Sequence, residues 1–444
     1  MDRQSVAAQT GRSVGRMVLR PAGLLALTGA LVAITSCTTG SSFNPTTTAV
    51  QDVSLETTQQ SADVISPLII AGVAPDPTPV KGSDDRFHVA YELTVLNFAP
   101  RPATITSVQT LAPDGSVITS LSQEQVAART MIVADYSSPE PAGGGDGASS
   151  TMIAAGKTAL LVLDDAYATR DAIPASVTHR ISATFGPAES GEGAIAVLWP
   201  DQATQTGGPV TIAAAEPVQI GAPLTGPGWF ITSACCTLNA HRNVLLPVDG
   251  RINGAERFAI DAVLLDVAVA EERGLVDDVV HDGDPTRNES YLAYGAPILA
   301  VADATVVHVE AAVPDTPAGS LPLGPGFTLE NLGGNAVTLE LAPDLFAVYY
   351  HLAPGSPTVQ VGDRVTKGQV IARLGNSGNS SEAHLHFQLS RTPLIFSSDS
   401  VPYVFDQFSV VGTVDEATKS IVHQSTPGLR RAELPLALNV VDFP

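Results

Sequence analysis

The sequence predicts an all-β protein with two folded parts built from antiparallel strands. Three observations support this: short runs of alternating apolar and polar residues, turn-forming residues between those runs, and no long segment with a helical period of 3.6 residues. Glycine (38 residues) and proline (33 residues) are frequent among the 444 residues, which suits a loop-rich β protein. Hydrophobic residues make up 44% of the chain, enough to form sizeable cores.

The chain begins with a segment typical of an export signal. Residues 1–36 combine a basic start with a short apolar run at residues 24–34, and a Thr-Ser pair precedes Cys37. The apolar run is too short to cross a bilayer core of about 30 Å as a helix. The arrangement resembles a bacterial lipobox, in which the cysteine becomes lipidated. We therefore expect a signal peptide at 1–36 and an extracytoplasmic, cell-envelope protein held to the membrane by lipid on Cys37; the alternative is an ordinary secretory signal.

The next two segments are interpreted as a tether and a β-sandwich. Residues 37–60 include a Thr- and Ser-rich stretch without periodicity, which is typical of a flexible tether. Residues 61–220 contain alternating runs such as 88–96 and 177–185, whose apolar residues fall on one face. This pattern predicts an immunoglobulin-like sandwich.

The predicted sandwich offers no catalytic cluster. The alternation places His179 on the apolar face of its strand, where a hydrogen-bonded core histidine is expected. His88 falls at a strand edge with no partner visible in the sequence. We therefore expect this part of the chain to have a positioning or binding role.

A Gly/Pro-rich joint at residues 219–228 separates the sandwich from a second predicted domain, residues 228–444. A long acidic loop is expected at residues 266–290. Further strands are expected at residues 243–248, 258–265, 298–309, 336–341, 346–351, 370–374 and 383–389.

The charge balance excludes one class of partner. Lys and Arg number 23 against 45 Asp and Glu, a formal net charge of −22. Such an acidic surface repels phosphate backbones, so nucleic acid is not an expected partner.

The strongest chemical motif is the pair His384 and His386. Residues two apart in a strand project from the same face, so both imidazoles are expected in one site. Histidine is the commonest metal ligand, and such a pair suits Zn²⁺.

The motifs around this pair follow a known order. They are GAPILAVAD at 295–303, GNAV at 334–337, YYHL at 349–352, VGDRVTKGQVI at 361–371 and GNSGNSSEAHLHF at 375–387. This region resembles the LytM/lysostaphin-like zinc metalloendopeptidases, which cut peptide bonds in bacterial peptidoglycan. The resemblance implies a two-sheet antiparallel β domain of the barrel-sandwich, duplicated-hybrid-motif type, with its site in a groove.

The resemblance also implies roles for individual residues. Asp261 and His386 match zinc ligands, and His351 and His384 match the two catalytic histidines. Arg257 stands where the family has its first zinc-ligand histidine, and a guanidinium has no lone pair to offer a metal.

Three explanations of Arg257 are open. Another group, such as His241, supplies the missing ligand; or Arg257 pairs with Asp261 in a metal-free remnant; or Arg257 grips a substrate carboxylate. The first explanation gives a peptidoglycan metalloendopeptidase with bound Zn²⁺. The second gives a catalytically silent protein that binds the cell wall or regulates other wall hydrolases.

The adjacent Cys235 and Cys236 have three interpretations: a vicinal disulfide, two buried thiols, or metal ligands. Exported thiols tend to oxidise, so the disulfide is favoured.

Overall fold

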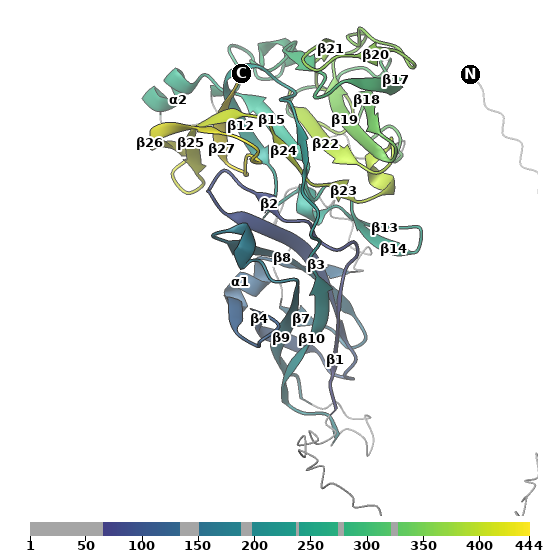
Figure 1. Ribbon diagram of the computed structural model, residues 1–444, viewed down its shortest axis with the longest axis vertical. Helices are drawn as coiled ribbons and strands as arrows, with labels where there is room; N and C mark the ends of the chain where they lie inside the picture. Colours follow the sequence, from purple (N-terminus) through teal and green to yellow (C-terminus); the bar gives the residue numbers. More distant parts are fainter. Residues whose placement is uncertain (1–64, 134–150, 188–197, 237–238, 274–278, 321–326) are drawn as a thin grey trace, which may run out of the picture. The chain divides into compact units, whose positions relative to one another are not determined.

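The computed structural model describes residues 65–133, 151–187, 198–236, 239–273, 279–320 and 327–444. Strands dominate these residues, and the α-helices among them, α1 (Gln123–Ala127) and α2 (Val267–Arg273), are short, which confirms the all-β prediction (Figure 1). The predicted signal peptide, tether and Cys37 lie outside the described residues. Among the helices that are described, none combines the length and hydropathy needed to cross a membrane.

The first part of the chain forms two five-stranded antiparallel sheets. One sheet has the order β1-β3-β8-β6, with β2 paired to β3; the other has the order β10-β9-β4-β5, with β7 paired to β4. The first sheet contains β1 (Leu68–Gly72), β2 (Val80–Lys81), β3 (Phe87–Asn97), β6 (Thr130–Val133) and β8 (Thr158–Tyr167). The second contains β4 (Ala103–Leu111), β5 (Val117–Ser122), β7 (Met152–Ile153), β9 (Ser176–Phe185) and β10 (Gln202–Thr211). Side chains from both sheets share one core, and the immunoglobulin-like topology stays a prediction.

Strand β3 is buried on both faces. Tyr91 and Leu93 point into the core between the two sheets, as the alternation predicts. Ala90, on the opposite face, belongs to the core of the second part of the chain, and its neighbour on that face, Glu92, is 0% exposed. The face of β3 that the sequence pattern assigns to solvent is therefore covered.

The second part of the chain is organised around one eleven-stranded sheet. Its order is β20-β17-β18-β19-β22-β15-β12-β27-β25-β26, with β23 paired to β22 (Figure 1). Its strands are β12 (Gly226–Ser233), β15 (Ile260–Leu264), β17 (Ala304–Glu310), β18 (Asn335–Ala342), β19 (Leu345–Leu352), β20 (Arg364–Val365), β22 (Leu385–Ser390), β23 (Ser400–Val401), β25 (Phe408–Asp415), β26 (Ser420–Arg430) and β27 (Asn439–Phe443).

Three two-stranded pairs complete this part. They are β13 (Leu245–Val248) with β14 (Arg251–Gly254), β16 (Pro297–Leu299) with β21 (Val370–Arg373), and the parallel pair β11 (Val218–Ile220) with β24 (Tyr403–Phe405). Ile298 of β16 and Ile371 of β21 are packed in the same core as the large sheet. The β11–β24 pair ties the Gly/Pro-rich joint to the second part, and the domain boundary at 220–228 stays a prediction.

The observed strands of the second part differ from the expected ones at several positions. The strand expected at 298–309 is divided between β16 and β17, which belong to different sheets. Ala300 and Val301 at the break are fully buried, so the apolar pattern continues through the bend and does not reveal it. Strands β25 to β27, near the C-terminus, extend the large sheet although the sequence analysis did not predict them.

The two histidines of the sandwich have different environments. His179 is a core residue with both ring nitrogens within hydrogen-bonding distance of partners, Tyr91 Oη and the Gly208 carbonyl, as its position predicts. His88 does have partners: Nδ1 lies 2.9 Å from Asp164 Oδ2 and Nε2 lies 3.1 Å from Asp84 Oδ1. Burial alone would lower the pKa of His88, but the hydrogen bonds and charges of Asp164 and Asp84 raise it to about 9.

This raised pKa predicts a pH-dependent stability. Because the folded protein holds the proton more tightly than the unfolded chain, the stabilisation is complete below pH 6.5 and is lost as the pH rises through about 9. We expect the free energy of unfolding to fall over that range by about 2–3 kcal/mol more in the wild type than in His88→Gln. Urea titrations at several pH values measure this difference. Equal slopes in both proteins would show that His88 does not contribute it, and His308→Gln is the matched control.

Candidate metal and catalytic site

Two of the predicted ligands meet on neighbouring strands of the large sheet. Asp261 of β15 lies directly opposite His386 of β22 in the antiparallel register. Cross-strand neighbours have adjacent side chains, and His386 Nδ1 lies 3.0 Å from Asp261 Oδ1. The period-2 pattern that predicted His386 thus places it beside the carboxylate.

The third predicted candidate, His241, joins the same cluster from outside the sheet. It begins a single 3-10 turn, His241–Asn243, which precedes β13. Its Nε2 lies 2.9 Å from Asp261 Oδ2, so each carboxylate oxygen of Asp261 is within hydrogen-bonding distance of one imidazole. The ligand atoms of these three residues all lie within 4.8 Å of one another.

The hydrogen bonds behind the two imidazoles fit a metal centre. His241 Nδ1 donates to the Ala259 carbonyl at 3.2 Å, so Nε2, beside Asp261, is the atom that would bind a metal once its proton is displaced. His386 Nε2 lies 3.2 Å from Gln388 Oε1, so Nδ1, beside the same carboxylate, is the atom that would bind a metal while Nε2 donates to Gln388. Two imidazoles and a carboxylate match the three protein ligands of catalytic zinc sites. The residues present therefore fit zinc.

His351 and His384 form a second pair beside this cluster, with ring centroids 4.6 Å apart. His384 Nε2 lies 3.6 Å from Asp261 Oδ1, while its Nδ1 donates to the Glu382 carbonyl at 2.9 Å. His351 Nδ1 donates to the Ser377 carbonyl at 2.8 Å. Backbone carbonyls thus hold both rings with Nε2 available for proton exchange.

The electrostatics of the site differ between the histidines. Burial alone would lower the pKa of His241. The charge of Asp261 and its hydrogen bond to the imidazole outweigh burial and raise this pKa to about 9. Burial works against the Asp261 carboxylate, but His241 and then His384 hold the pKa of Asp261 well below its usual value. Burial and the neighbouring histidines lower the pKa of His351 well below 6.5, so His351 is neutral at neutral pH.

Two glycines allow the loop that holds His351 to pack closely. Gly334 and Gly378 both have positive φ, 65° and 80°. A Cβ on Gly334 would lie 2.4 Å from the Ser377 carbonyl carbon, and a Cβ on Gly378 would lie 2.3 Å from the Gly334 nitrogen. This backbone contact brings the Ser377 carbonyl to His351, which itself has a φ of 61°.

Arg257 points away from the metal-ligand cluster. Its Nε lies 3.1 Å from both Glu92 oxygens, its Nη2 lies 2.6 Å from Glu92 Oε2, and Nη2 also lies 3.5 Å from Asp399 Oδ1. An ion pair between Arg257 and Asp261 is therefore not the arrangement found, because Asp261 is occupied by histidines. With an exposed fraction of 4%, Arg257 is also poorly placed to grip a substrate carboxylate.

Removing this arginine should destabilise the protein. In Arg257→Leu, Glu92 keeps only Arg242 as a partner in a fully buried position. Breaking a buried ion pair costs about 3–5 kcal/mol, because one charge is left uncompensated. Chemical denaturation followed by circular dichroism measures the loss. Arg251→Leu, at a half-exposed arginine that pairs with Asp399, is the control and should cost much less. A similar loss in both variants would contradict this interpretation of Arg257.

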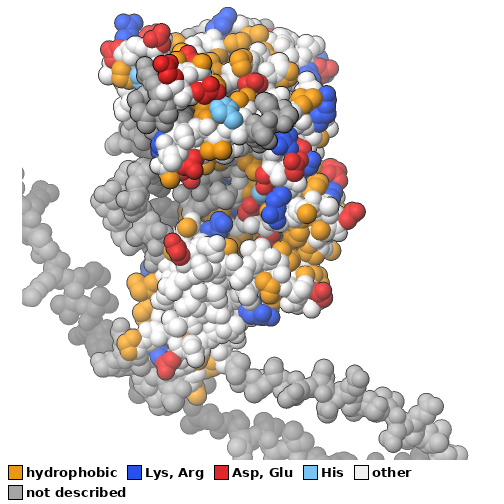
Figure 2. Space-filling model, turned by 90° about the vertical axis from the view of Figure 1, so that its left-hand side faces the viewer, with side chains coloured by type: hydrophobic (Ala, Val, Ile, Leu, Met, Phe, Trp, Pro, Cys, Tyr) orange, Lys and Arg blue, Asp and Glu red, His pale blue; other side chains and the backbone are white. Residues whose placement is uncertain are grey.

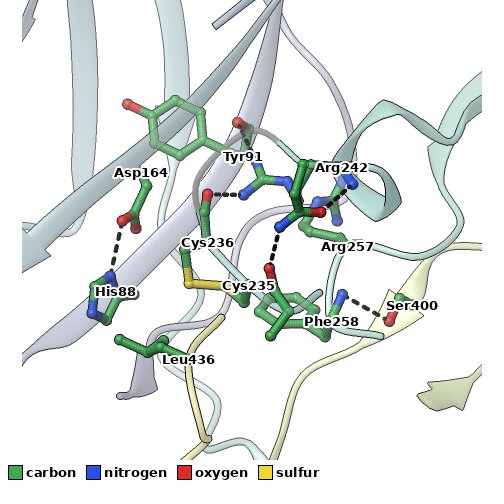
Figure 3. Close-up of a disulfide and its surroundings, with 12 residues drawn as sticks. His88, Tyr91, Asp164, Cys235, Cys236, Arg242, Arg257, Phe258, Ser400 and Leu436 are labelled. Carbon is green, nitrogen blue, oxygen red and sulfur yellow. Dashed lines mark hydrogen bonds and ion pairs between the residues drawn. A yellow bond between two sulfur atoms is a disulfide. The ribbon is translucent and has the colours of Figure 1, made fainter. Parts of the chain in front are cut away.

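Cys235 and Cys236 form a vicinal disulfide (Figure 3). The Cys236 carbonyl accepts a hydrogen bond from Arg242 Nη1, so the disulfide lies beside the turn that carries His241. His88 and Asp164 lie near it on the sandwich side (Figure 3). In this state neither sulfur offers a thiolate ligand.

The sequence analysis missed two polar residues of the site. Gln388 orients His386 and is itself anchored by donating from Nε2 to the Ala255 carbonyl. Glu256, which is 7% exposed, has an oxygen 3.9 Å from His386 Nε2, and burial raises its pKa. Gln388 lies two residues after His386, so the strand period was a signal that both share a face.

The surface charge agrees with the composition. On the face shown in Figure 2, acidic side chains lie among basic ones and do not surround a basic patch. The chain as a whole has 45 acidic against 23 basic residues.

Comparison with known proteins gives one family match. Residues 290–395 match the model described as Peptidase family M23. This span contains His351, His384 and His386, while His241 and Asp261 precede it. No curated protein matches the chain.

Several solved structures are similar to parts of the chain. The catalytic domain of a mutant prophage-encoded M23 protein, EnpA, from Enterococcus faecalis is 18% identical over 41% of this chain and 93% of that chain, with a TM-score of 0.23. The catalytic domain of lysostaphin from Staphylococcus simulans is 20% identical over 37% of this chain and 75% of that chain, with a TM-score of 0.18. LytU is 30% identical over 22% of this chain and 57% of that chain, with a TM-score of 0.17.

Proposed function

Since residues 290–395 match the model of peptidase family M23, we propose that this chain is a zinc-dependent endopeptidase that hydrolyses peptide bonds of bacterial peptidoglycan. The observation that supports this most is the cluster of His241, Asp261 and His386, whose ligand atoms converge within 4.8 Å. The cluster supports the explanation of Arg257 in which His241 supplies the missing ligand.

The residues of the site divide into two groups. His241, Asp261 and His386 would hold the zinc ion, and Gln388 and the Ala259 carbonyl would orient the two imidazoles. When bound, zinc lowers the pKa of a water molecule to about 7 and polarises a carbonyl oxygen. His384 lies beside the cluster, with its Nε2 3.6 Å from Asp261 Oδ1.

His351 and His384 would carry the proton transfers. The lowered pKa of His351 keeps its imidazole neutral, so Nε2 can accept a proton at neutral pH. The Nδ1 hydrogen bonds to Ser377 and Glu382 carbonyls keep both rings in the tautomer with Nε2 available. A ring that has accepted a proton at Nε2 becomes an imidazolium, and its Nε2–H could then donate to a developing oxyanion or to the leaving amine.

The proposal also includes export and attachment to the membrane through lipid on Cys37. Cys37→Ala should leave the protein unprocessed or release it from the membrane fraction, because the lipid is the expected anchor. Fractionation of cells, with labelling by a fatty-acid analogue, measures this outcome. Unchanged membrane retention and normal processing of the variant would contradict lipidation at Cys37.

The central experiment measures zinc and turnover in the same preparation. We expect one bound zinc ion per chain and release of soluble peptides from purified peptidoglycan, with both lost after chelation and restored by zinc. The alternative function, a silent protein that binds the wall or regulates other hydrolases, is motivated by Arg257 at the ligand position. A folded protein that sediments with peptidoglycan but neither binds zinc nor releases peptides would favour that alternative.

A further inference from the structure

We propose that Glu92 of the sandwich is a positioning residue for the metal ligand His241, so that the sandwich forms part of the metal centre. This inference rests on the proposed zinc-dependent function. It extends the site beyond the M23 domain to strand β3.

The first observation is a buried cluster of one carboxylate and two guanidinium groups. Glu92 Oε1 accepts from Arg242 Nη2 at 2.9 Å, and Glu92 Oε2 accepts from Arg257 Nη2 at 2.6 Å. The exposed fractions of Glu92, Arg242 and Arg257 are 0%, 1% and 4%. In such surroundings the three charges depend on one another, because water cannot replace a missing partner.

The second observation concerns the turn that carries His241. Arg242 is its next residue, and Arg242 Nη2 also lies 3.3 Å from the carbonyl oxygens of Tyr91 and Leu163 on β3 and β8. Figure 3 shows this guanidinium between the Tyr91 backbone and the disulfide, whose Cys236 carbonyl it contacts. These hydrogen bonds therefore attach the 3-10 turn to the sandwich. A shift of Arg242 would displace its neighbour, the ligand His241.

The third observation is that the Glu92 carboxylate also binds Arg257, in the segment that precedes Asp261. Arg257 precedes Asp261 by four residues, and its guanidinium passes so close to Gly254 that a Cβ there would lie 2.6 Å from Nη2. The two segments that supply His241 and Asp261 are thus tied to one side chain of β3. Removing the negative charge of Glu92 should loosen both segments.

Two variants and one control test this role. Glu92→Gln keeps the shape of the side chain and removes its charge, and Arg242→Lys keeps a charge but loses the forked contacts to β3 and β8. We expect each variant to bind zinc about 10–100-fold more weakly than the wild type, as for loss of an outer-shell partner. Arg101→Gln is the matched control: Arg101 is a buried arginine of the sandwich that pairs with Asp201, so zinc affinity should stay at the wild-type value.

Zinc dissociation constants are measured by competition with a chromophoric chelator, at a temperature where circular dichroism shows each variant to be folded. The ligand-field spectrum with Co²⁺ is a second readout, because a change in ligand geometry alters it whereas a loss of global stability alone does not. If Glu92→Gln does not fold, Arg242→Lys decides the outcome.

The expected result is weaker zinc binding and an altered Co²⁺ spectrum in the two variants but not in the control. Wild-type zinc affinity in folded Glu92→Gln or, failing that, in Arg242→Lys would overturn the inference while leaving the proposed function intact. A wild-type protein that binds no zinc would contradict the proposed function, and this inference with it.

Discussion

Replacing His241 with alanine should weaken zinc binding by more than about 100-fold, beyond what loss of an outer-shell partner costs, and should stop peptidoglycan hydrolysis. The reason is the number of ligands: without His241, only Asp261 and His386 remain, and catalytic zinc sites hold the ion with three protein groups. Chelator competition and metal analysis of the dialysed protein measure the affinity, and release of soluble peptides measures the turnover.

His308→Ala provides the matched histidine control for this experiment. His308 lies on β17 and is not part of the metal-ligand cluster, so zinc affinity and turnover should stay at wild-type values. If His241→Ala keeps stoichiometric zinc, then another group completes the site and the assignment of His241 is wrong.

Replacing His351 with asparagine should lower kcat by about 10²- to 10⁴-fold while zinc stays bound. His351 lies outside the set of three ligands, but its neutral imidazole is the proposed proton acceptor. Asparagine is preferred to alanine because position 351 has a φ of 61°, a conformation that asparagine tolerates well. Peptide release at saturating substrate, together with metal analysis of the same sample, measures both parts of the prediction.

Comparing the loss of kcat with the zinc content of His351→Asn distinguishes a role in proton transfer from a role in metal binding. A loss of kcat that matches a loss of zinc would mean that His351 supports the metal site, not proton transfer. Near-wild-type kcat in a folded, zinc-loaded variant would remove His351 from the mechanism.

The sequence predicted those parts of the site that follow from local rules. The placement of His384 and His386 on one face depends only on the two-residue period: His384 directly precedes β22 and His386 lies on it, and both are beside Asp261. Asp261 was located by family resemblance, and its register with His386 follows from the pairing of β15 with β22. His241 was one open alternative, because it lies sixteen positions before Arg257, with loop and strand between them.

What the sequence could not predict depends on contacts between distant segments. Glu92 lies on the face of β3 opposite the sandwich core, a position that alternation assigns to water, yet packing against the second part buries it completely. The direction of Arg257 depends on that same carboxylate, 165 residues earlier in the chain. No local periodicity carries information about such a pairing.

The contact between Gly334 and Gly378 has a consequence for genetic studies of this protein. Each glycine has a backbone conformation that other residues rarely adopt, and each would place a new methyl group within 2.4 Å of the other segment. In a saturation mutagenesis screen for activity, both positions should therefore tolerate as few substitutions as the histidines do. Such a screen would rank two residues without any reactive atom among the essential ones, and a sequence profile built from functional variants would preserve them as invariant.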